Sequence, residues 1–290
     1  MRCTLLGTGT SHGIPVIACD CDCCRSQDSK DKRYRCSMWI TDGATPLDSA
    51  TSILIDIGPD FRSQALHFGI RKIDAVLLTH GHADHMNGMD DIRIFSHTCS
   101  LEPPSQDGVQ RVHPETKGQG LPIYGNATTL QDLHERFSYV FKPVLEGGGK
   151  PKINTVDCSL YSVEYPLEVG SLSIIPVPLI HGSLETVGWL LGKGNKYVAY
   201  LTDCNSIPKT SMDLLRRFSG KIEHLVIDGL RRRPHSTHFS FSQAAEVADK
   251  IGAKHNWFTH ICHDMTHVQI EQCFKNQNIA PAYDGLVIEI

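Results

Sequence analysis

The run DAVLLTHGHADH at residues 74–85 constrains this chain more than any other stretch. Its first part, 75–79, is apolar and rich in bulky side chains, which predicts a short buried strand. Four metal-type side chains follow in the pattern H-x-H-x-D-H: His80, His82, Asp84 and His85. Residues two apart in an extended chain point the same way, so the first two histidines can hold one cation, while the last two side chains face a second point beyond the Gly81 turn. Imidazole nitrogens and carboxylate oxygens suit zinc, manganese or iron, so the motif predicts two adjacent divalent-metal sites.

Three later strands are predicted to end on side chains of the same kind. The runs 172–180 and 196–203 are short and largely apolar, and the run 254–260 contains Trp257 and Phe258, so each is predicted to be a strand. At their ends lie His181, Asp203 and His260. Each strand delivers one metal-type ligand where it ends, as the first motif does, so we expect these side chains to meet that motif in the fold.

The cysteines indicate a separate metal site near the start of the chain. The sequence has 11 cysteines, an odd number, and four of them lie within residues 19–24. Such crowding suits metal binding better than a disulfide framework. Cys19, Cys21 and Cys24 follow the spacing C-x-C-x-x-C, with Cys23 between them. Three thiolates can converge on one zinc ion, and a structural zinc site needs a fourth ligand from elsewhere in the chain.

Composition narrows the class of protein. With 290 residues, 40% hydrophobic and 21% charged, the chain can bury a large core, as one domain or as two tightly joined halves. A formal net charge of −4 argues against a general binder of nucleic acid or anionic membranes. No apolar stretch has the length of a membrane span, and the N-terminus leads directly into a strand-like run with no export signal, so we expect a cytoplasmic protein.

Strands and helices alternate along the rest of the chain. Strand runs at 37–41 and 51–58 flank turn residues, which predicts a hairpin, and Asp60 is expected to cap a helix reaching His67. Further helices are predicted at Asn126–Phe137, at Pro208–Phe218, after the Ser240–Gln243 capping box and after Thr266. This order predicts a mixed sheet with helices on at least one face.

Two stretches interrupt the alternation. Residues 97–120 contain prolines, glycines and charges without usable periodicity, which predicts either a lid over the metal motif or a disordered segment. GGGKPK at 147–152 is predicted to be a flexible link that could divide two similar halves, about 1–146 and 153–290, of a single domain.

Several motifs together resemble one family. GTGTSHGIP followed by C-x-C-x-x-C, then THGHADH, GMDDIR, LIHG, LTD and THICH, spanning residues 4–264, resemble the PhnP-like branch of the metallo-β-lactamase superfamily. That branch contains phosphoribosyl cyclic phosphate phosphodiesterases. The resemblance implies an α/β (α+β) fold, the αββα sandwich of two mixed β-sheets flanked by helices. Residues 97–120 look like an insertion relative to the branch.

The resemblance also implies how the ligands are shared. One metal would be held by His80, His82 and His181, and the second by Asp84, His85 and His260, with Asp203 bridging both. The family's structural zinc takes a histidine three residues beyond the last active-site histidine. Here that residue is His263, joining Cys19, Cys21 and Cys24; Cys262 and Cys23 remain alternatives. The expected cofactors are therefore two divalent ions, zinc or manganese, and one structural zinc.

The chemistry implied is hydrolysis of a phosphodiester. Two divalent cations, two aspartates and a bridging hydroxide leave a site of about +1, which attracts the phosphodiester anion and activates the attacking hydroxide. Asp84 and Asp203 serve catalysis as metal ligands, and His238 is the expected general acid for the leaving alkoxide, with His235 as its rival. Asp228 is a candidate to orient a histidine. The expected substrate contacts are Arg93, His235 and Arg233, the last within the run 231–233, which can anchor a second phosphate.

Other functions use the same metal chemistry with a different pocket. A tRNA-processing endonuclease would need a basic surface for RNA, and the net charge gives little sign of one. A thiolester hydrolase is a further alternative. A metal-bearing scaffold without turnover is disfavoured because every metal ligand is retained. The expected partner is a small phosphodiester, with no membrane, nucleic acid not favoured and a homodimer left open.

Overall fold

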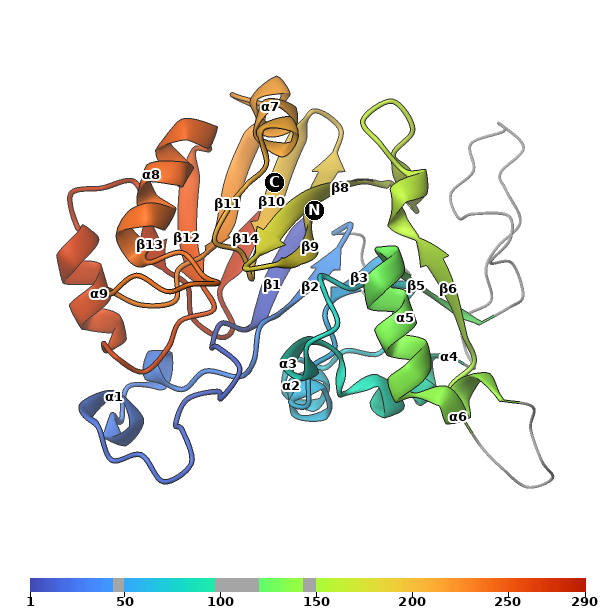
Figure 1. Cartoon of the computed structure of the whole chain (residues 1–290), viewed down its shortest axis with the longest axis horizontal. Coiled ribbons are helices and arrows are strands. Elements are labelled where there is room, and N and C mark those ends of the chain that lie inside the picture. The colour runs from blue at the N-terminus through green and yellow to red at the C-terminus, as the bar shows by residue number, and fades with distance from the viewer. Residues whose placement is uncertain (44–49, 97–119, 143–149) are drawn as a thin grey trace.

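Two seven-stranded sheets form the middle of the molecule in the computed structural model, which describes residues 1–43, 50–96, 120–142 and 150–290. The first sheet has the order β14-β1-β2-β3-β4-β5-β6 and the second β13-β12-β11-β10-β9-β8-β7 (Figure 1). The strands of the first sheet are β1 (Arg2–Gly7), β2 (Ser37–Thr41), β3 (Ser52–Ile55), β4 (Ala75–Leu77), β5 (Leu121–Gly125), β6 (Ile153–Asp157) and β14 (Val287–Glu289). Those of the second are β7 (Leu167–Val169), β8 (Leu172–His181), β9 (Leu184–Lys193), β10 (Lys196–Leu201), β11 (Ile222–Asp228), β12 (His255–Thr259) and β13 (Ala280–Pro281).

The two sheets share one pairing pattern. From β14 to β3 the neighbouring strands are antiparallel, and from β3 to β6 they are parallel. The second sheet repeats this order, antiparallel from β7 to β10 and parallel from β10 to β13. Both sheets are therefore mixed, as predicted. Because β6 belongs to the first sheet, the chain crosses to the second sheet between β6 and β7, after the 147–152 stretch rather than within it.

The helices of the described residues are α1 (Asp22–Arg25), α2 (Phe61–Phe68), α3 (Ala83–Met86), α4 (Arg93–Ser96), α5 (Ala127–Arg136), α6 (Ser138–Phe141), α7 (Lys209–Arg217), α8 (Phe241–Ile251) and α9 (His267–Phe274). Helices α2 and α5 pack on the first sheet and α7, α8 and α9 on the second, whereas α1 lies in a loop that projects away from both sheets (Figure 1). Within the described part of the chain, every helix is too short or too polar to cross a lipid bilayer.

Three apolar cores hold these layers together. The central core lies between the sheets and includes Leu5 from one and Trp189 and Tyr200 from the other. A second core packs Phe61 of α2 and residues of α5 against the first sheet, and a third packs Phe241 of α8 against the second sheet. Apolar burial on both faces of each sheet accounts for strands that are almost continuously hydrophobic. This is the predicted αββα sandwich.

The helix starts agree with the sequence except at one position. Asn126 accepts from the Thr129 N–H at 2.9 Å, and Ser240 with Gln243 forms a complete capping box. Asp60 precedes α2, but the prediction that its side chain caps the helix is wrong. Its carboxylate instead accepts from the backbone N–H and the guanidinium of Arg35, each at 2.9 Å. A charged partner competes better for this carboxylate than a helix N–H does.

The predicted hairpin between 37–41 and 51–58 is confirmed by the antiparallel pairing of β2 and β3. Its turn lies outside the described residues, as do residues 97–119 of the predicted lid or disordered segment. The first part of the predicted 147–152 link, 147–149, also lies outside them.

Candidate metal centres

Strand ends bring the predicted histidines and aspartates together at one edge of the sandwich. His80 follows β4, His181 ends β8, and Asp203 and His260 follow β10 and β12. The carboxyl ends of parallel strands lie at the same edge of a sheet, so these side chains converge although the chain separates them widely.

The ligand atoms form two adjoining sets. His80, His82, His181 and Asp203 each offer one atom within 4.8 Å of the others, and so do Asp84, His85, Asp203 and His260. Asp203 belongs to both sets. The structure therefore brings together every residue of the predicted dinuclear site, in the predicted grouping.

Unpartnered nitrogen atoms test whether this centre fits metal ions. The Nε2 atoms of His80, His85 and His260 are buried and have no hydrogen-bond partner among the described residues. His85 Nε2 lies 3.1 Å from Asp203 Oδ2 and 3.2 Å from Asp84 Oδ2. Leaving such groups buried and unsatisfied costs free energy, which a shared cation removes. The donor set, imidazole with carboxylate, fits zinc or manganese.

The charge states of His80, Asp84 and Asp203 suit cations, whereas these two carboxylates, against the effect of burial, raise the pKa of His85 well above its ordinary value. Burial, aided by the neighbouring His85, lowers the pKa of His80 well below its ordinary value, so its imidazole is neutral and able to bind metal. Although burial opposes it, the surrounding imidazoles hold the pKa of Asp203 well below its usual range. Asp84 is held ionised in the same way, with its pKa lowered by His85 and His260 against the effect of burial. Two anionic carboxylates therefore stand among the imidazoles.

Asp56 orients one of the ligands and was missed at the level of the sequence. This fully buried aspartate follows β3, and its Oδ2 lies 2.7 Å from His85 Nδ1. It also accepts from the Thr79 backbone N–H at 2.8 Å and the Thr79 hydroxyl at 2.9 Å. A carboxylate on Nδ1 leaves Nε2 of His85 facing the other ligands. The available signal was that Asp56 ends a strand, as Asp203 does.

Three residues of this centre have an unusual backbone. Asp56, Asp203 and His260 have φ values of 59°, 51° and 57°. This left-handed region is rare for residues other than glycine and costs free energy that the surrounding structure must offset. Such conformations concentrate where a chain must aim a side chain sharply, here at the two ligand sets.

His238 lies against the edge of the ligand sets. Its ring stacks on that of His260, with centroids 4.6 Å apart and an interplanar angle of 14°, and lies 4.5 Å from the ring of His181. Asp228, at the end of β11, holds His238 Nδ1 at 2.7 Å and also accepts from the Cys204 N–H. This is the orienting contact predicted for Asp228. Burial lowers the pKa of His238.

Of the predicted substrate contacts, His235 lies beside His238, and the two arginines lie at the exposed surface. The His235 ring lies 5.3 Å from that of His238. Arg233 is largely exposed and pairs with Asp264 at 3.7 Å. Arg93 is exposed on α4.

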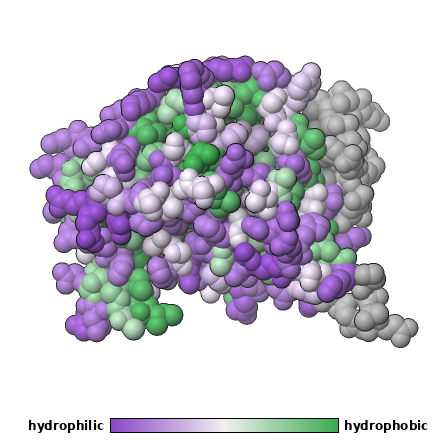
Figure 2. Space-filling model, viewed as in Figure 1, coloured by the Kyte–Doolittle hydropathy of each residue, from purple (hydrophilic) through white to green (hydrophobic). Residues whose placement is uncertain are grey.

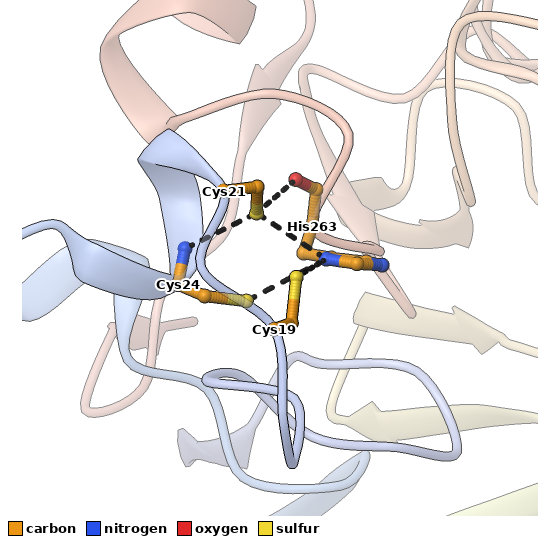
Figure 3. Close-up of side chains that lie close together, drawn as sticks. All are labelled: Cys19, Cys21, Cys24 and His263. Carbon is orange, nitrogen blue, oxygen red and sulfur yellow. Dashed lines mark hydrogen bonds between the residues drawn. The ribbon is translucent and has the colours of Figure 1, made fainter.

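The cysteines form the second centre with His263 (Figure 3). His263 Nδ1 lies 3.3 Å from Cys19 Sγ, 3.4 Å from Cys21 Sγ and 3.5 Å from Cys24 Sγ. Although burial opposes it, hydrogen bonds from the Cys24 N–H and the His263 ring lower the pKa of Cys21 to about 7, which favours the thiolate. Three thiols around one imidazole nitrogen are the donor set of a structural zinc. In the described residues this cluster contains neither Cys23 nor Cys262, the two alternatives.

Residues 19–24 with His263, named the zinc knuckle because their donor set suits zinc, support an apolar protrusion. Figure 2 shows apolar surface gathered at the loop beside α1, and Ile17 in that loop is 94% exposed. Ile14, Cys23 and Cys24 form a small core beneath it.

Two cavities lie at different distances from the ligand sets. One of about 690 Å³ lies beside β8 and α7 and contains none of the ligand residues. A smaller one, about 230 Å³, is bordered by His238 and His235 and reaches His263. Because the smaller cavity adjoins His238, the candidate general acid, it is the cavity that a substrate at the ligand sets would reach.

Known proteins share this architecture. The model of the Beta-lactamase superfamily domain matches residues 51–261. The solved structure of a diphosphatase from the PhnP family is 37% identical, with a TM-score of 0.77, covering 100% of this chain and 97% of that one. Zinc-bound PqqB from Methylobacterium extorquens, 20% identical with a TM-score of 0.73 over the whole of both chains, shares the fold.

Two sequence relatives have other names. The octanoyltransferase of Porphyromonas gingivalis is 35% identical over 289 residues, which are 99% of this chain and 51% of that protein. The chain thus spans about half the length of this relative. The ribonuclease Z of Clostridium acetobutylicum is 24% identical over 245 residues, 72% of this chain and 78% of that protein. Because the family model covers more than half of the chain and the PhnP-family structure matches it from end to end, the chain belongs to the metallo-β-lactamase superfamily, in its PhnP-like branch.

Proposed function

We propose that this hydrolase is a dinuclear metal-dependent phosphodiesterase acting on a small cyclic phosphodiester, such as a phosphoribosyl 1,2-cyclic phosphate. The observation that carries the proposal is the pair of ligand sets that share Asp203, with unpartnered Nε2 atoms directed between them. The diphosphatase of the PhnP family and ribonuclease Z, both similar to this chain, are named for cleavage at phosphorus.

The residues that would hold the metals are those of the two sets. His80, His82 and His181 would bind one ion, Asp84, His85 and His260 the other, and Asp203 both. Zinc or manganese bound there would lower the pKa of water and stabilise negative charge on phosphoryl oxygens. The zinc knuckle would hold a third ion, a structural zinc, and fasten the N-terminal loop to the segment after His260.

The chain's own contribution to the reaction is to hold the ligands and to supply a proton. Asp56 fixes Nδ1 of His85, and the carbonyl of Thr237 accepts from Nδ1 of His181 at 2.7 Å, so both rings present Nε2 inward. His238 is fixed at Nδ1 by Asp228 in the same manner. Its Nε2 is not engaged by Asp228, and it would donate a proton to the leaving alkoxide from the imidazolium form, in which both ring nitrogens carry hydrogen.

A substrate panel tests this proposal. Purified protein should hydrolyse bis(p-nitrophenyl) phosphate and a cyclic ribose phosphodiester, and chelation followed by dialysis should abolish both activities. Adding back zinc or manganese should restore them, while elemental analysis counts the ions bound. Preferred cleavage of a tRNA precursor or of a thiolester in the same panel would contradict the proposed substrate class and favour one of those alternatives. Metal-replete protein that hydrolyses none of these compounds would contradict hydrolytic function of this kind.

A further inference from the structure

Every buried histidine of the two ligand sets needs an acceptor for the ring nitrogen that faces away from the metal. A neutral imidazole that binds a metal through Nε2 carries its proton on Nδ1. That N–H almost always donates to a carboxylate, a carbonyl oxygen or a water, and the contact fixes the ring. A buried N–H without such a partner costs free energy, and its ring is held less firmly toward the metal.

Three of the four buried histidine ligands have such a partner. The oxygen atoms lie between 2.7 and 3.0 Å from Nδ1, with Thr79 serving His80, Asp56 serving His85 and the Thr237 carbonyl serving His181. His260 is the fourth. Its Nδ1 is buried and has no hydrogen-bond partner among the residues that the structure describes. Within the described ranges, this ligand therefore lacks the orienting contact that the other three have.

Asp228 offers an acceptor next to the His260 ring. Its Oδ2 accepts from the Cys204 N–H at 2.9 Å and lies 2.7 Å from His238 Nδ1. Its Oδ1 is buried and, in the described part of the chain, has no partner. Asp228, His238 and His260 each offer one ligand-type atom within 4.8 Å of the others. Burial raises the pKa of Asp228 well above its ordinary value, and the charge of His260 opposes that rise, which shows that the two groups act on each other.

The orientation of the His260 ring places Nδ1 on the right side for this contact. Its Nε2 lies 3.3 Å from Asp203 Oδ1 and 3.6 Å from Asp84 Oδ2, so that nitrogen faces the other ligands and Nδ1 faces away from them. The ring of His260 is nearly parallel to that of His238, with an interplanar angle of 14° and centroids 4.6 Å apart. The two oxygens of one carboxylate can therefore serve two stacked rings.

We propose that Asp228 is the positioning residue for His260 as well as for His238, with Oδ1 accepting from Nδ1 of His260 when that histidine binds a metal. The inference rests on the proposed function, because it concerns a ligand of that same metal centre. One carboxylate then fixes both a ligand of the second ion and the candidate general acid, and it thereby sets the position of each relative to the other.

Asp228→Asn separates the two contacts of the carboxylate. The amide oxygen keeps the place of Oδ2, where it accepts from the Cys204 N–H and from His238, so the NH₂ group takes the place of Oδ1. A donor then faces the Nδ1–H of His260. Titration of the stripped variant with zinc, followed by elemental analysis, should show one ion of the dinuclear centre bound about 10–100-fold more weakly than in the wild type. His238→Ala is the matched control, because it removes the other imidazole held by Asp228, and it should keep the wild-type zinc affinities.

Nuclear magnetic resonance reports the contact itself. In the zinc-loaded wild type, long-range proton–nitrogen spectra should show His260 protonated at Nδ1, with a downfield proton that exchanges slowly with water. Asp228→Asn should move this proton upfield and speed its exchange. The Nδ1 proton of His85, which Asp56 holds, should stay unchanged and serves as the internal reference. A purely structural role of Asp228 would not single out the proton of His260.

The outcomes separate this inference from the proposed function. Wild-type zinc affinities in Asp228→Asn, an equal loss in His238→Ala, or a weaker affinity with an unchanged His260 proton would each overturn the positioning role. Hydrolysis of phosphodiesters by the wild type would still support the proposed function in each case. A wild type that shows the Asp228-dependent proton but hydrolyses no phosphodiester keeps the inference and contradicts the proposed function. Should thermal unfolding show that Asp228→Asn does not fold, the wild-type spectrum decides: a slowly exchanging Nδ1 proton on His260 supports the contact, and a freely exchanging one overturns it.

Discussion

Replacing Asp56 with asparagine isolates the charge that orients His85. Asparagine has nearly the same shape and tolerates the left-handed backbone at φ 59°, so the substitution adds little strain. Its amide oxygen can still accept from the Thr79 N–H. Its NH₂ group, however, replaces the oxygen that now faces His85 Nδ1 at 2.7 Å and the Thr79 hydroxyl at 2.9 Å.

The imidazole must then turn its lone pair toward the amide and carry its proton on Nε2. That nitrogen lies 3.1 Å from Asp203 Oδ2 and 3.2 Å from Asp84 Oδ2, where the proposed second metal would bind. A protonated Nε2 cannot be a ligand. Loss of an orienting carboxylate typically costs about 10–100-fold in metal affinity or activity, which is about 1.4–2.7 kcal/mol of binding free energy.

The assay is metal titration of the stripped protein, followed by elemental analysis and hydrolysis of bis(p-nitrophenyl) phosphate. Asp56→Asn should bind one of the two ions 10–100-fold more weakly, an order-of-magnitude expectation. Asp60→Asn serves as the control, because Asp60 pairs with Arg35 and not with a ligand. If Asp56→Asn binds both metals and turns over as the wild type does, the orienting role of Asp56 is refuted.

Three further substitutions probe other parts of the molecule. His238→Ala should slow turnover by about 100-fold or more while both metals stay bound; loss of a metal would instead assign His238 a structural role. Cys21→Ser should lose the zinc of the knuckle and lower the Tm, whereas Cys273→Ser, at an exposed cysteine, should do neither; unchanged zinc content in the first variant would rule out the structural zinc. Burial raises the pKa of Asp284 from 3.8 to about 7, so the folded protein retains a proton that the unfolded chain releases and loses stability as pH rises across that window. Urea unfolding should show Asp284→Asn gaining stability relative to wild type between pH 4 and 7, by on the order of 4 kcal/mol, and a constant difference would refute the assignment.

The sequence was most informative where chemistry and local geometry coincide. The spacing H-x-H-x-D-H and the ligands at strand ends follow from the period of an extended chain, so the residues of both ligand sets could be named before the fold was known. The αββα arrangement was accessible only through the family resemblance, because the pairing of strands distant in sequence has no local signature. Asp60 shows the same limit, since its partner Arg35 lies 25 residues away.

Residues that orient a metal ligand, rather than bind the metal themselves, were harder to predict from the sequence. Asp56 stands alone between a strand and a turn, without the spacing that marks the histidines. The cavity beside His238 depends on how three separate segments meet. Arg93 belongs to a family-like motif, and the structure places it at the exposed surface of α4.

The zinc knuckle joins two segments of the polypeptide, one synthesised early and the other near the end of translation. Cys19 and His263 are 244 residues apart, and β1 pairs with β14 at the other extreme of the chain. On the ribosome, the three thiols leave the exit tunnel long before the imidazole that completes their site exists. Completion of this four-residue cluster is therefore among the last events of biogenesis, and a nascent chain stalled before residue 263 would present the three thiols without their imidazole.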